Sequence, residues 1–480
     1  MKADRVLLLA GVVGALLAIL GCLPLIALPY QIDYGEGLVL DGALRVRHSQ
    51  ALYPDPFAFP VVLHVYGPVA YAATALFLPG GTPSFPAGRF MVLACSIVLA
   101  LLVGAILRRL TASWWIGLAF GLVLLALPAF RFWLYLLRAD VIGVVFSTIG
   151  IALYVLKEKE WYWSIPFFSL AIFCKYSLLA APVAVFLHLI LNRRVMQGFG
   201  FAAATVSACT AGFIYLQVTT DGWFAFHMFS THPDRYSVAQ FAALAALVAA
   251  SAPVVAVLAF TYVVHEFRSV NPSLPAVYFV ISFLTGLTAG KLGSTTNHFI
   301  EWMVASCMCA GLGYSWLRSM YPAKAMPIAA LLCASVLIGV VAQNASSLQP
   351  SRELADCGRV YQQVHDSPSD RILSQSLGPL LKAAKPVLLS DPFVYGQTVK
   401  HGLRSDQIEK FVNEKYFGLI LMGTDPTQLK LHDNDIWPQS LIAAIARNYR
   451  VVNRFSCRDA GVMLEPLSAN GIQQDSSVLK

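Results

Sequence analysis

The sequence predicts an all-α polytopic membrane protein with about eleven transmembrane helices, followed by a small C-terminal α/β soluble domain. Three observations support this prediction. Of the 480 residues, 57% are hydrophobic and only 12% are charged. Long apolar runs recur along the chain as far as residue 343, and the hydropathy falls after residue 344. One soluble core cannot bury this much apolar surface, whereas a lipid bilayer can solvate it.

The apolar runs of spanning or near-spanning length give the expected number of helices. The first run follows Lys2 and Arg5 and resembles a signal peptide, but it is too long for one, so we expect an uncleaved span. The expected spans are 6–28, 88–107, 113–130, 139–156, 161–174, 176–191, 198–217, 239–264, 272–289, 296–317 and 325–343.

The orientation follows from the basic pairs between these runs. The run 63–80 is ambiguous, and counting it as a span would put several basic pairs outside. The positive-inside rule therefore favours a surface-lying or re-entrant helix there. Residues 161–191 must then form a helical hairpin that turns near Lys175. The basic groups assigned to the cytoplasm are Arg108-Arg109, Lys157 with Lys159, and Arg193-Arg194.

The same assignment divides the chain. Residues 1–345 form the membrane module, in which 29–87 is the first external loop with juxtamembrane helices, and residues 346–480 form a soluble domain on the same, outer face. Within that domain the apolar patterns predict one helix at Leu441–Asn448 and four strands. The predicted strands are Val387–Ser390, Phe417–Met422, Tyr449–Phe455 and Val462–Glu465.

Several classes of site lack a signal in the sequence. The formal charge of +8 comes from short basic pairs between apolar runs, not from one basic face, so we expect no nucleic-acid partner. No P-loop and no metal-ligand spacing occurs, so no metal site is predicted. Two of the nine cysteines, Cys357 and Cys457, lie in the soluble domain, where an oxidising exterior would permit them to pair.

The first external loop carries acids directly after the first span. Asp33 and Glu36 are three residues apart and can lie on one side of a helical turn, where a carboxylate accepts a proton or holds a cation. The alternative is that they cap a helix. Asp41, one turn further on, can either serve the site or pair with Arg45. Asp55 reads as a turn residue.

Charges at the outer ends of later spans form a second group. Burying the charges of Arg138 and Asp140 at a membrane boundary costs free energy unless water hydrates them. They therefore either serve the function of the protein or form a structural salt bridge. Lys175 lies in an apolar hairpin with no acid nearby in sequence, so it must either reach toward water or meet an anion.

The segment 290–298 supplies a cation, hydroxyls, small residues and backbone amides ahead of a helix. This combination suits a phosphate group, because free amides and a helix dipole both attract anions. Lys291 is its cation. Asn297 and Glu301 have an alternative role at the start of the following helix, and His298 is either a proton carrier or a packed ring.

Several of these segments resemble the polytopic GT-C glycosyltransferases, which include protein mannosyltransferases and aminoarabinose transferases. The resemblance covers about residues 1–345. The segments are Asp33-Tyr34-Gly35-Glu36-Gly37, Asp41-Gly42-Ala43-Leu44, Leu52-Tyr53, Val65-Tyr66-Gly67-Pro68, Arg138-Ala139-Asp140, Phe173-Cys174-Lys175-Tyr176 and Gly293-Ser294-Thr295-Thr296-Asn297-His298-Phe299-Ile300-Glu301.

The resemblance implies an enzyme that transfers a sugar from a polyprenyl-phosphate carrier to a lipid, glycan or protein acceptor on the outer face of a bacterial inner membrane. Asp33 or Glu36 would be the catalytic base, and Glu36 matches best by position. The donor-phosphate-binding residues would be Lys175, Lys291 and Arg138. The substrate-binding residues would be Asp41, Tyr66, Asp140, Asn297, His298 and Glu301. Some members use a divalent cation near these acids, and nothing in this sequence requires one.

Two other classes of function fit parts of the pattern. A transporter or flippase for a lipid-linked sugar would also need outer-face cations and a hydrophobic groove, but it should contain two related halves, and the sequence contains no internal repeat. A non-catalytic membrane scaffold would tolerate neutralisation of Asp33 and Glu36.

Overall fold

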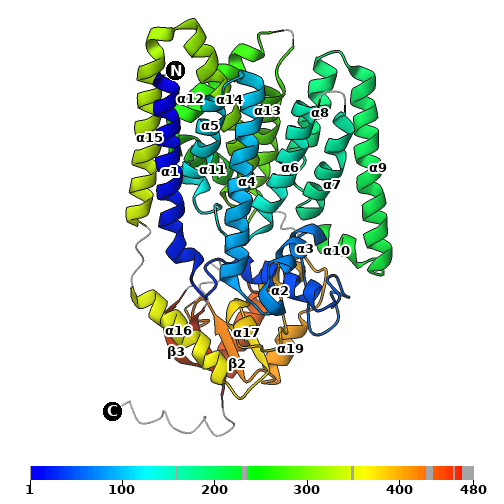
Figure 1. Ribbon diagram of the computed structural model, residues 1–480. Coiled ribbons are helices and arrows are strands. Elements are labelled where there is room, and N and C mark those ends of the chain that lie inside the picture. The colour runs from blue at the N-terminus through cyan, green and yellow to red at the C-terminus, as the bar shows by residue number, and fades with distance from the viewer. Residues whose placement is uncertain are drawn as a thin grey trace.

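The computed structural model describes residues 2–157, 160–229, 235–269, 271–346, 351–428, 436–457 and 460–467. Long helices fill most of residues 2–346, and short helices with four strands follow. Figure 1 shows the long helices side by side in one bundle, with the strands gathered beyond the end opposite the N-terminus. A helical membrane part with a small α/β part, as the sequence predicts, is therefore confirmed.

Most helices of the bundle run between its two ends (Figure 1). They are α1 (Lys2–Ile26), α4 (Phe85–Thr111), α5 (Trp114–Ala126), α6 (Ala139–Leu156), α7 (Ser164–Cys174), α8 (Ala180–Leu191), α9 (Val195–Thr219), α11 (Val238–Ser251), α12 (Pro253–Glu266), α13 (Leu274–Thr285), α14 (Ile300–Met320) and α15 (Ala325–Ser346). Shorter helices lie near the strands, namely α2 (Tyr34–Arg47), α3 (Pro68–Leu76) and α10 (Trp223–Phe229). The 3₁₀ turns are η1 (Pro79–Gly81), η2 (Pro128–Phe130), η3 (Trp161–Trp163), η4 (Gly286–Gly290), η5 (Thr296–Phe299) and η6 (Pro322–Lys324).

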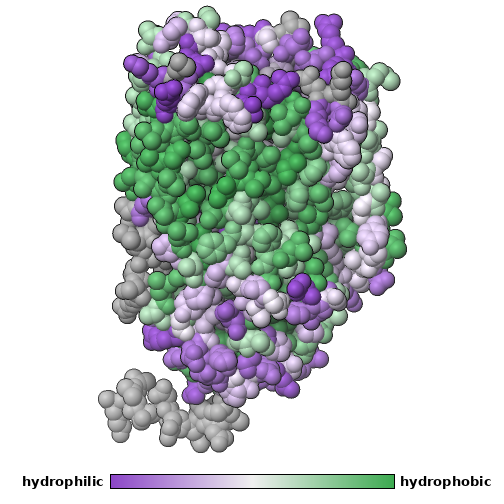
Figure 2. Space-filling model, in the orientation of Figure 1, coloured by the Kyte–Doolittle hydropathy of each residue, from purple (hydrophilic) through white to green (hydrophobic). Residues whose placement is uncertain are grey.

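Length and composition qualify five described helical segments as single membrane spans, fewer than the eleven predicted. They are Lys2–Ile26, Phe85–Thr111, Ala139–Leu156, Val195–Thr219 and Pro322–Asn344. Four further apolar helices have only 10 to 17 residues. Figure 2 shows one continuous hydrophobic band between two hydrophilic ends. The chain is thus a multi-pass membrane protein, and the total of eleven stays a prediction.

Two of the expected spans differ from the structure. The run 239–264 is not one straight helix, because α11 and α12 meet at an angle of 102°. Pro253 begins α12 and lacks the amide that would continue the hydrogen-bond ladder of α11. The run 113–130 is helical only as far as Ala126, since Pro128 follows. In the run 63–80, α3 has nine residues and is too short to cross, as expected for a surface or re-entrant helix.

Small residues let α4 and α5 pack closely, which membrane helices need because lipid offers no hydrophobic driving force between them. A Cβ on Gly117 of α5 would lie 2.5 Å from the carbonyl oxygen of Gly104 on α4. A Cβ on Gly121, one turn further, would lie 2.3 Å from the carbonyl oxygen of Ala100. No side chain fits at either position.

The C-terminal domain is a four-stranded mixed sheet covered by short helices. The strands are β1 (Ile372–Ser374), β2 (Leu419–Met422), β3 (Tyr449–Cys457) and β4 (Ala460–Pro466), in the order β1-β2-β4-β3. β1 runs parallel to β2, and β4 runs antiparallel to both β2 and β3. The helices are α16 (Ser351–Asp366), α17 (Gly378–Lys382), α18 (Pro392–Lys400), α19 (Gln407–Asn413) and α20 (Gln439–Asn448).

Three of the four predicted strands and the predicted helix are present, as β2, β3, β4 and α20. The fourth prediction, Val387–Ser390, is wrong. This segment forms only a single parallel bridge, from Leu389 to Val61 of the first external loop. β1 was not predicted, because three buried residues give too short a pattern to recognise. The predicted domain extends to residue 480, and 468–480 lie outside the described residues.

The C-terminal domain binds the first external loop through the backbone as well as side chains. The amide of Val61 donates to the carbonyl oxygen of Leu388 at 2.9 Å. The hydroxyl of Ser390 accepts from the amide of Leu63 at 2.7 Å and donates to its carbonyl oxygen at 3.1 Å. All of these groups are buried, so the loop and the domain form one continuous core.

A wholly buried ion pair anchors the start of this loop. Both Glu36 of α2 and Arg89 of α4 are 0% exposed, and the guanidinium Nη2 lies 2.6 Å from Oε2 of the carboxylate. Arg89 also donates to the carbonyl oxygens of Leu25 and Leu28 at the end of α1. Glu36 accepts from the amide of Leu137 at 3.2 Å. The pair therefore connects α4 to the end of α1, to α2 and to the segment that contains Leu137.

A second buried network holds the middle of the loop. Oδ2 of Asp41 lies 3.1 Å from Nε2 of His64 and 3.2 Å from Nε of Arg45. Burial alone would raise the pKa of Asp41, but His64 and Arg45 outweigh it and lower the pKa. Nδ1 of His227 accepts from the amide of His64 at 3.1 Å, and Nε2 of His227 donates to the carbonyl oxygen of Pro54 at 2.9 Å. This network links α2 to α10.

The two cysteines of the soluble domain form a disulfide. Cys357 of α16 and Cys457 of β3 are 100 residues apart in sequence, and their Cα atoms are 4.9 Å apart. The bond clamps α16 onto the edge of the sheet. The other seven cysteines are free.

We predict that Glu36→Gln destabilises the protein by about 3–5 kcal/mol, because it leaves the buried Arg89 guanidinium without a counter-charge. Thermal unfolding of purified protein in detergent measures this. Glu160→Gln is the matched control, since Glu160 pairs with Lys157 at the surface, where both side chains are about half exposed, and its loss should cost less than about 1 kcal/mol. Equal melting of Glu36→Gln and wild type would contradict the assignment.

We predict that the protein loses stability as the pH falls from about 6.5 toward 4. Burial lowers the pKa of His227 from 6.5 to about 4, so the folded state holds a neutral ring while the unfolded chain takes up the proton. Stability is fully present above the unfolded pKa and falls by up to about 1.4 kcal/mol per pH unit within the window.

Melting temperatures between pH 4 and 7 test this prediction. His227→Phe should reduce the slope in this window, while the exposed His48→Gln should keep the wild-type slope. A slope that is the same in His227→Phe as in wild type would contradict the prediction.

We predict that the Cys357→Ser/Cys457→Ser variant loses about 2–5 kcal/mol of stability in the C-terminal domain, because the disulfide closes a long loop in the unfolded chain. Limited proteolysis of the domain, with and without reductant, measures the loss. Cys333→Ser, which changes a free cysteine of α15, is the control. A wild-type protein that is indifferent to reductant would refute the prediction.

Candidate active site

A cavity of about 580 Å³ lies where the helical bundle meets the C-terminal domain. Three parts of the structure contribute charged or polar groups to its wall, namely the loop 29–87, the ends of the bundle helices nearest the C-terminal domain, and the segment before α18. Its charged lining residues are Asp33, Arg138, Lys175, Lys291 and Asp391. Its further polar lining residues include Tyr34, Tyr66, Thr296, Asn297 and His298.

Asp33 reaches this cavity from the N-terminus of α2. One oxygen, Oδ1, caps the helix by accepting from the amide of Gly35 at 2.9 Å and also accepts from Nη1 of Arg138 at 2.7 Å. The other oxygen, Oδ2, has no hydrogen-bond partner among the described residues, and the side chain is 25% exposed. Asp33 therefore caps the helix and still offers an oxygen to a ligand.

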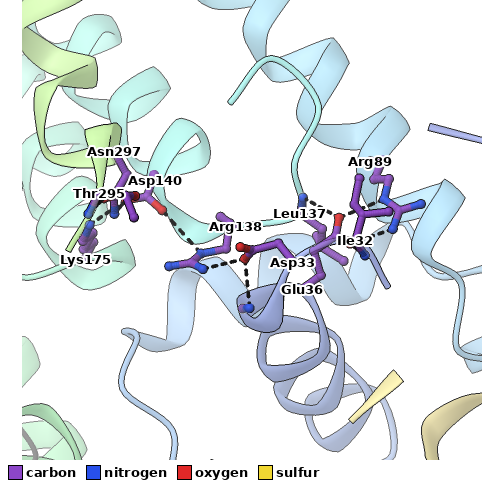
Figure 3. Close-up of polar contacts among 11 residues, drawn as sticks. Ile32, Asp33, Glu36, Arg89, Leu137, Arg138, Asp140, Lys175, Thr295 and Asn297 are labelled. Carbon is purple, nitrogen blue, oxygen red and sulfur yellow. Dashed lines mark hydrogen bonds and ion pairs between the residues drawn. The ribbon is translucent and has the colours of Figure 1, made fainter. Parts of the chain in front are cut away.

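Asp140, at the start of α6, organises the cations. It is 2% exposed, and its Oδ1 lies 2.5 Å from Nζ of Lys175 and accepts from Nδ2 of Asn297 at 2.9 Å. Its Oδ2 lies 3.8 Å from Nε of Arg138. Figure 3 shows Arg138 between Asp33 and Asp140, with Lys175 and Asn297 on the far side of Asp140. Asp140 itself does not line the cavity but holds three residues that do.

The segment 291–298 forms another part of the wall. Lys291 forms no ion pair with a described residue, so its charge is available to a ligand. Gly293 has a φ of +78°, a left-handed conformation that glycine adopts without strain. Nδ1 of His298 is 2.7 Å from the hydroxyl of Thr288, and the indole of Trp133 donates to the hydroxyl of Thr296 at 2.9 Å. Hydrogen bonds to Thr288 and to Trp133 thus fix the position of this segment.

The structure separates some predicted site residues from this cavity. Glu36 and Asp41 lie in the two buried networks of the first loop and do not line it. Glu301 accepts from the hydroxyl of Tyr278 at 3.1 Å and lies behind the wall, in a small neighbouring cavity that also contacts Lys175 and His298. The guanidinium of Arg138 lies 5.9 Å above the ring of Tyr66, and both face the main cavity.

Sequence reasoning missed the contribution of the C-terminal domain. Asp391, Phe393 and Val394 at the start of α18 line the cavity. Asp391 accepts from the hydroxyl of Tyr34 at 2.7 Å. The sequence Ser390-Asp391-Pro392 carries a helix-start signal, since Asp favours the N-cap and Pro the first turn, but nothing in it indicates that this helix faces the membrane module.

The acids of the cavity do not form a metal site among the described residues. No group of three or more His, Cys, Asp or Glu side chains in that part of the chain could hold a metal ion. The guanidinium of Arg138 already occupies the space between Asp33 and Asp140. A divalent cation does not fit between these two carboxylates.

Comparison with known proteins identifies the fold. No family model and no curated protein matches the sequence. Solved structures match over most of the chain. ArnT from Cupriavidus metallidurans, bound to undecaprenyl phosphate, is 13% identical with a TM-score of 0.63, and the match covers 95% of this chain and 98% of that one. Its apo state matches with the same identity and TM-score.

A second similar protein is the archaeal oligosaccharyltransferase AglB from Archaeoglobus fulgidus, in complex with an inhibitory peptide and a dolichol-phosphate. It is 12% identical with a TM-score of 0.54, and the match covers 94% of this chain and 72% of that one. ArnT, an aminoarabinose transferase, and AglB both have the GT-C fold. The chain therefore has the GT-C fold, as its sequence motifs suggest.

Proposed function

We propose that the protein is a membrane glycosyltransferase that moves a sugar from a polyprenyl-phosphate carrier to a hydroxyl or amide of a lipid, glycan or protein acceptor. One observation supports this best. A single cavity at the end of the apolar band combines a carboxylate with a free oxygen and three cationic side chains. A transfer from a lipid phosphate needs these two kinds of group, a proton acceptor and a stabiliser for the leaving anion.

In the proposed reaction, the nucleophilic atom of the acceptor attacks C1 of the sugar. Oδ2 of Asp33 takes the proton from that atom. The bond between C1 and the phosphate oxygen breaks, and its electron pair leaves with the carrier phosphate. The attack forms one glycosidic bond and releases one polyprenyl phosphate, and the proton stays on Asp33 until water removes it.

The residue roles follow from the contacts. Asp33 is preferred to Glu36 as the base, because both oxygens of Glu36 accept hydrogen bonds inside a buried ion pair. Lys291 is the first candidate for the carrier phosphate, since its charge is uncommitted among the described residues. Lys175 and Arg138 add positive charge, each already paired with an acid. Tyr66, Asn297 and His298 line the same cavity and are proposed to contact the substrate.

The other predicted residues are proposed to act through their neighbours. Asp140 positions Lys175 and Asn297, Glu301 supports the wall behind His298, and Glu36 and Asp41 anchor the first loop. The lipid carrier as a partner gains support from the similar structures, which contain undecaprenyl phosphate in ArnT and dolichol-phosphate in AglB. The identity of the sugar and of the acceptor follows from neither.

We also propose that residues 1–345 form the membrane module, that 346–480 form an extracytoplasmic domain, and that the protein resides in a bacterial inner membrane. The disulfide in the domain favours an oxidising compartment. The basic residues Arg108, Arg109 and Arg193 lie at the opposite side of the bundle, at the ends of α4 and α8 that are far from the domain. The positive-inside rule assigns such basic ends to the cytoplasm.

We predict that Asp33→Asn reduces transfer of a radiolabelled sugar at least about 100-fold, because the amide cannot accept the proton. The assay presents membranes that contain the protein with a panel of polyprenyl-phosphate sugars. Binding of the carrier should survive, since Asn retains an oxygen that can cap α2 and accept from Arg138.

Asp55→Asn is the control, because Asp55 is an exposed acid of the same loop whose side chain, among the described residues, accepts from the nearby amide of Phe57 and does not line the cavity. It should transfer as wild type does. Undiminished transfer by Asp33→Asn would refute the proposed base. A wild type that transfers from no donor would refute the enzyme and point to transport of the lipid-linked sugar instead.

A further inference from the structure

A carboxylate of the C-terminal domain forms part of the cavity wall and has no ion pair with a described residue. Asp391 is only 2% exposed and lines the cavity beside Tyr34. Its Oδ1 accepts from the hydroxyl of Tyr34 at 2.7 Å and from the amide of Val394 at 3.0 Å. It therefore caps α18 and also joins the domain to the first external loop.

The second oxygen of Asp391 remains available. Among the described residues, no donor lies at normal hydrogen-bond geometry to Oδ2, and no Lys or Arg pairs with the carboxylate, although the nearby amide of Phe393 and the ring of His64 favour its charged form. Burial raises the pKa of Asp391 above its ordinary value. Because this oxygen faces the cavity and has no protein donor, a hydroxyl of a bound ligand can replace the water that would otherwise solvate it.

The neighbours of Asp391 indicate which part of the ligand would reach it. Phe393, two residues further on, packs against the segment that carries Lys291. A Cβ on Gly293 would lie 3.1 Å from Cζ of its ring. The carboxylate thus belongs to the wall next to the proposed phosphate position. The group bonded directly to that phosphate is the sugar of the carrier.

We propose that Asp391 is a specificity-determining residue, which accepts a hydrogen bond from a hydroxyl of the carrier-linked sugar. The C-terminal domain then contributes to donor recognition, and it does more than cover the membrane module. This inference rests on the proposed function, because it assumes a sugar bound to a lipid phosphate in this cavity.

The domain contains a matched control for Asp391. Asp406 also caps a helix, α19, by accepting from the amide of Glu409 at 2.9 Å, and it also accepts from a tyrosine hydroxyl, that of Tyr395, at 2.7 Å. Asp406 does not line the cavity. The two acids therefore share these two kinds of contact, and of the two only Asp391 lines the cavity.

The test measures the affinity of purified protein in detergent for two probes. One probe is undecaprenyl phosphate, and the other is undecaprenyl phosphate that carries glucose, mannose or N-acetylglucosamine. Wild type should bind at least one sugar-bearing carrier more tightly than the bare carrier. Asp391→Asn should weaken that binding about 10- to 100-fold and leave the bare carrier unaffected, because a lost hydrogen bond to a charged group costs about 1.5–3 kcal/mol.

Two controls separate recognition from folding. Asn at position 391 can still cap α18 and accept from Tyr34, so the melting temperature should not change. Asp406→Asn should bind both probes as wild type does. The proposal is overturned if Asp391→Asn binds the sugar-bearing carrier normally, if it weakens both probes equally, or if wild type shows no preference for any sugar-bearing carrier.

A transfer assay on the same preparations distinguishes this inference from the proposed function. Wild type that binds a sugar-bearing carrier selectively but transfers nothing would refute the enzyme and leave the binding role of Asp391 intact. Wild type that transfers the sugar while Asp391→Asn transfers with unchanged kcat/KM would support the enzyme and overturn the role of Asp391.

Discussion

The buried ion pair between Glu36 and Arg89 is the contact on which the site depends. Both side chains are 0% exposed. The guanidinium also donates to carbonyl oxygens at the end of α1, and the carboxylate also accepts from two backbone amides. Such a pair is stable only when this shell is complete. Because one of those amides belongs to Leu137, the pair fixes the backbone beside Arg138, and Arg138 in turn orients Asp33. The geometry of the cavity therefore begins with a residue that does not line it.

The charges of the cavity are nearly balanced, and their arrangement determines which groups remain for a ligand. Asp140 neutralises Lys175 and lies near Arg138, while Asp33 neutralises Arg138. Among the described residues, Lys291 has no acidic partner, and one oxygen each of Asp33 and Asp391 has no hydrogen-bond donor at normal geometry. An anion, a nucleophile with a proton to lose and a hydroxyl-bearing group could thus be held at once, which matches the needs of glycosyl transfer.

The C-terminal domain participates in this arrangement because the first loop folds into its core. Val61 and Leu63 pack within the apolar cluster of the domain, and their backbone groups bond to Leu388 and Ser390. Because Ser390 is bonded to the loop, the next residue, Asp391, lies at the cavity wall. The segment 387–390 has the apolar character of a strand, yet its partner is the loop and not the sheet, which explains why a pattern-based prediction assigned it wrongly.

The sequence by itself determined the class of the protein and the residue types of its site. Hydropathy revealed the helical membrane part, and short apolar segments revealed β2, β3 and β4, because burial in lipid or in a sheet leaves a local apolar signal. It also identified Asp33, Arg138, Lys175 and Lys291 as unusual charges. Only the tertiary structure decided that Glu36 and Asp41 lie in buried networks outside the cavity, that α11 and α12 meet at an angle, and that Asp391 lines the cavity. These outcomes depend on contacts between residues far apart in the chain, such as Arg89 with Glu36 and Tyr34 with Asp391, and such contacts leave no trace in local sequence.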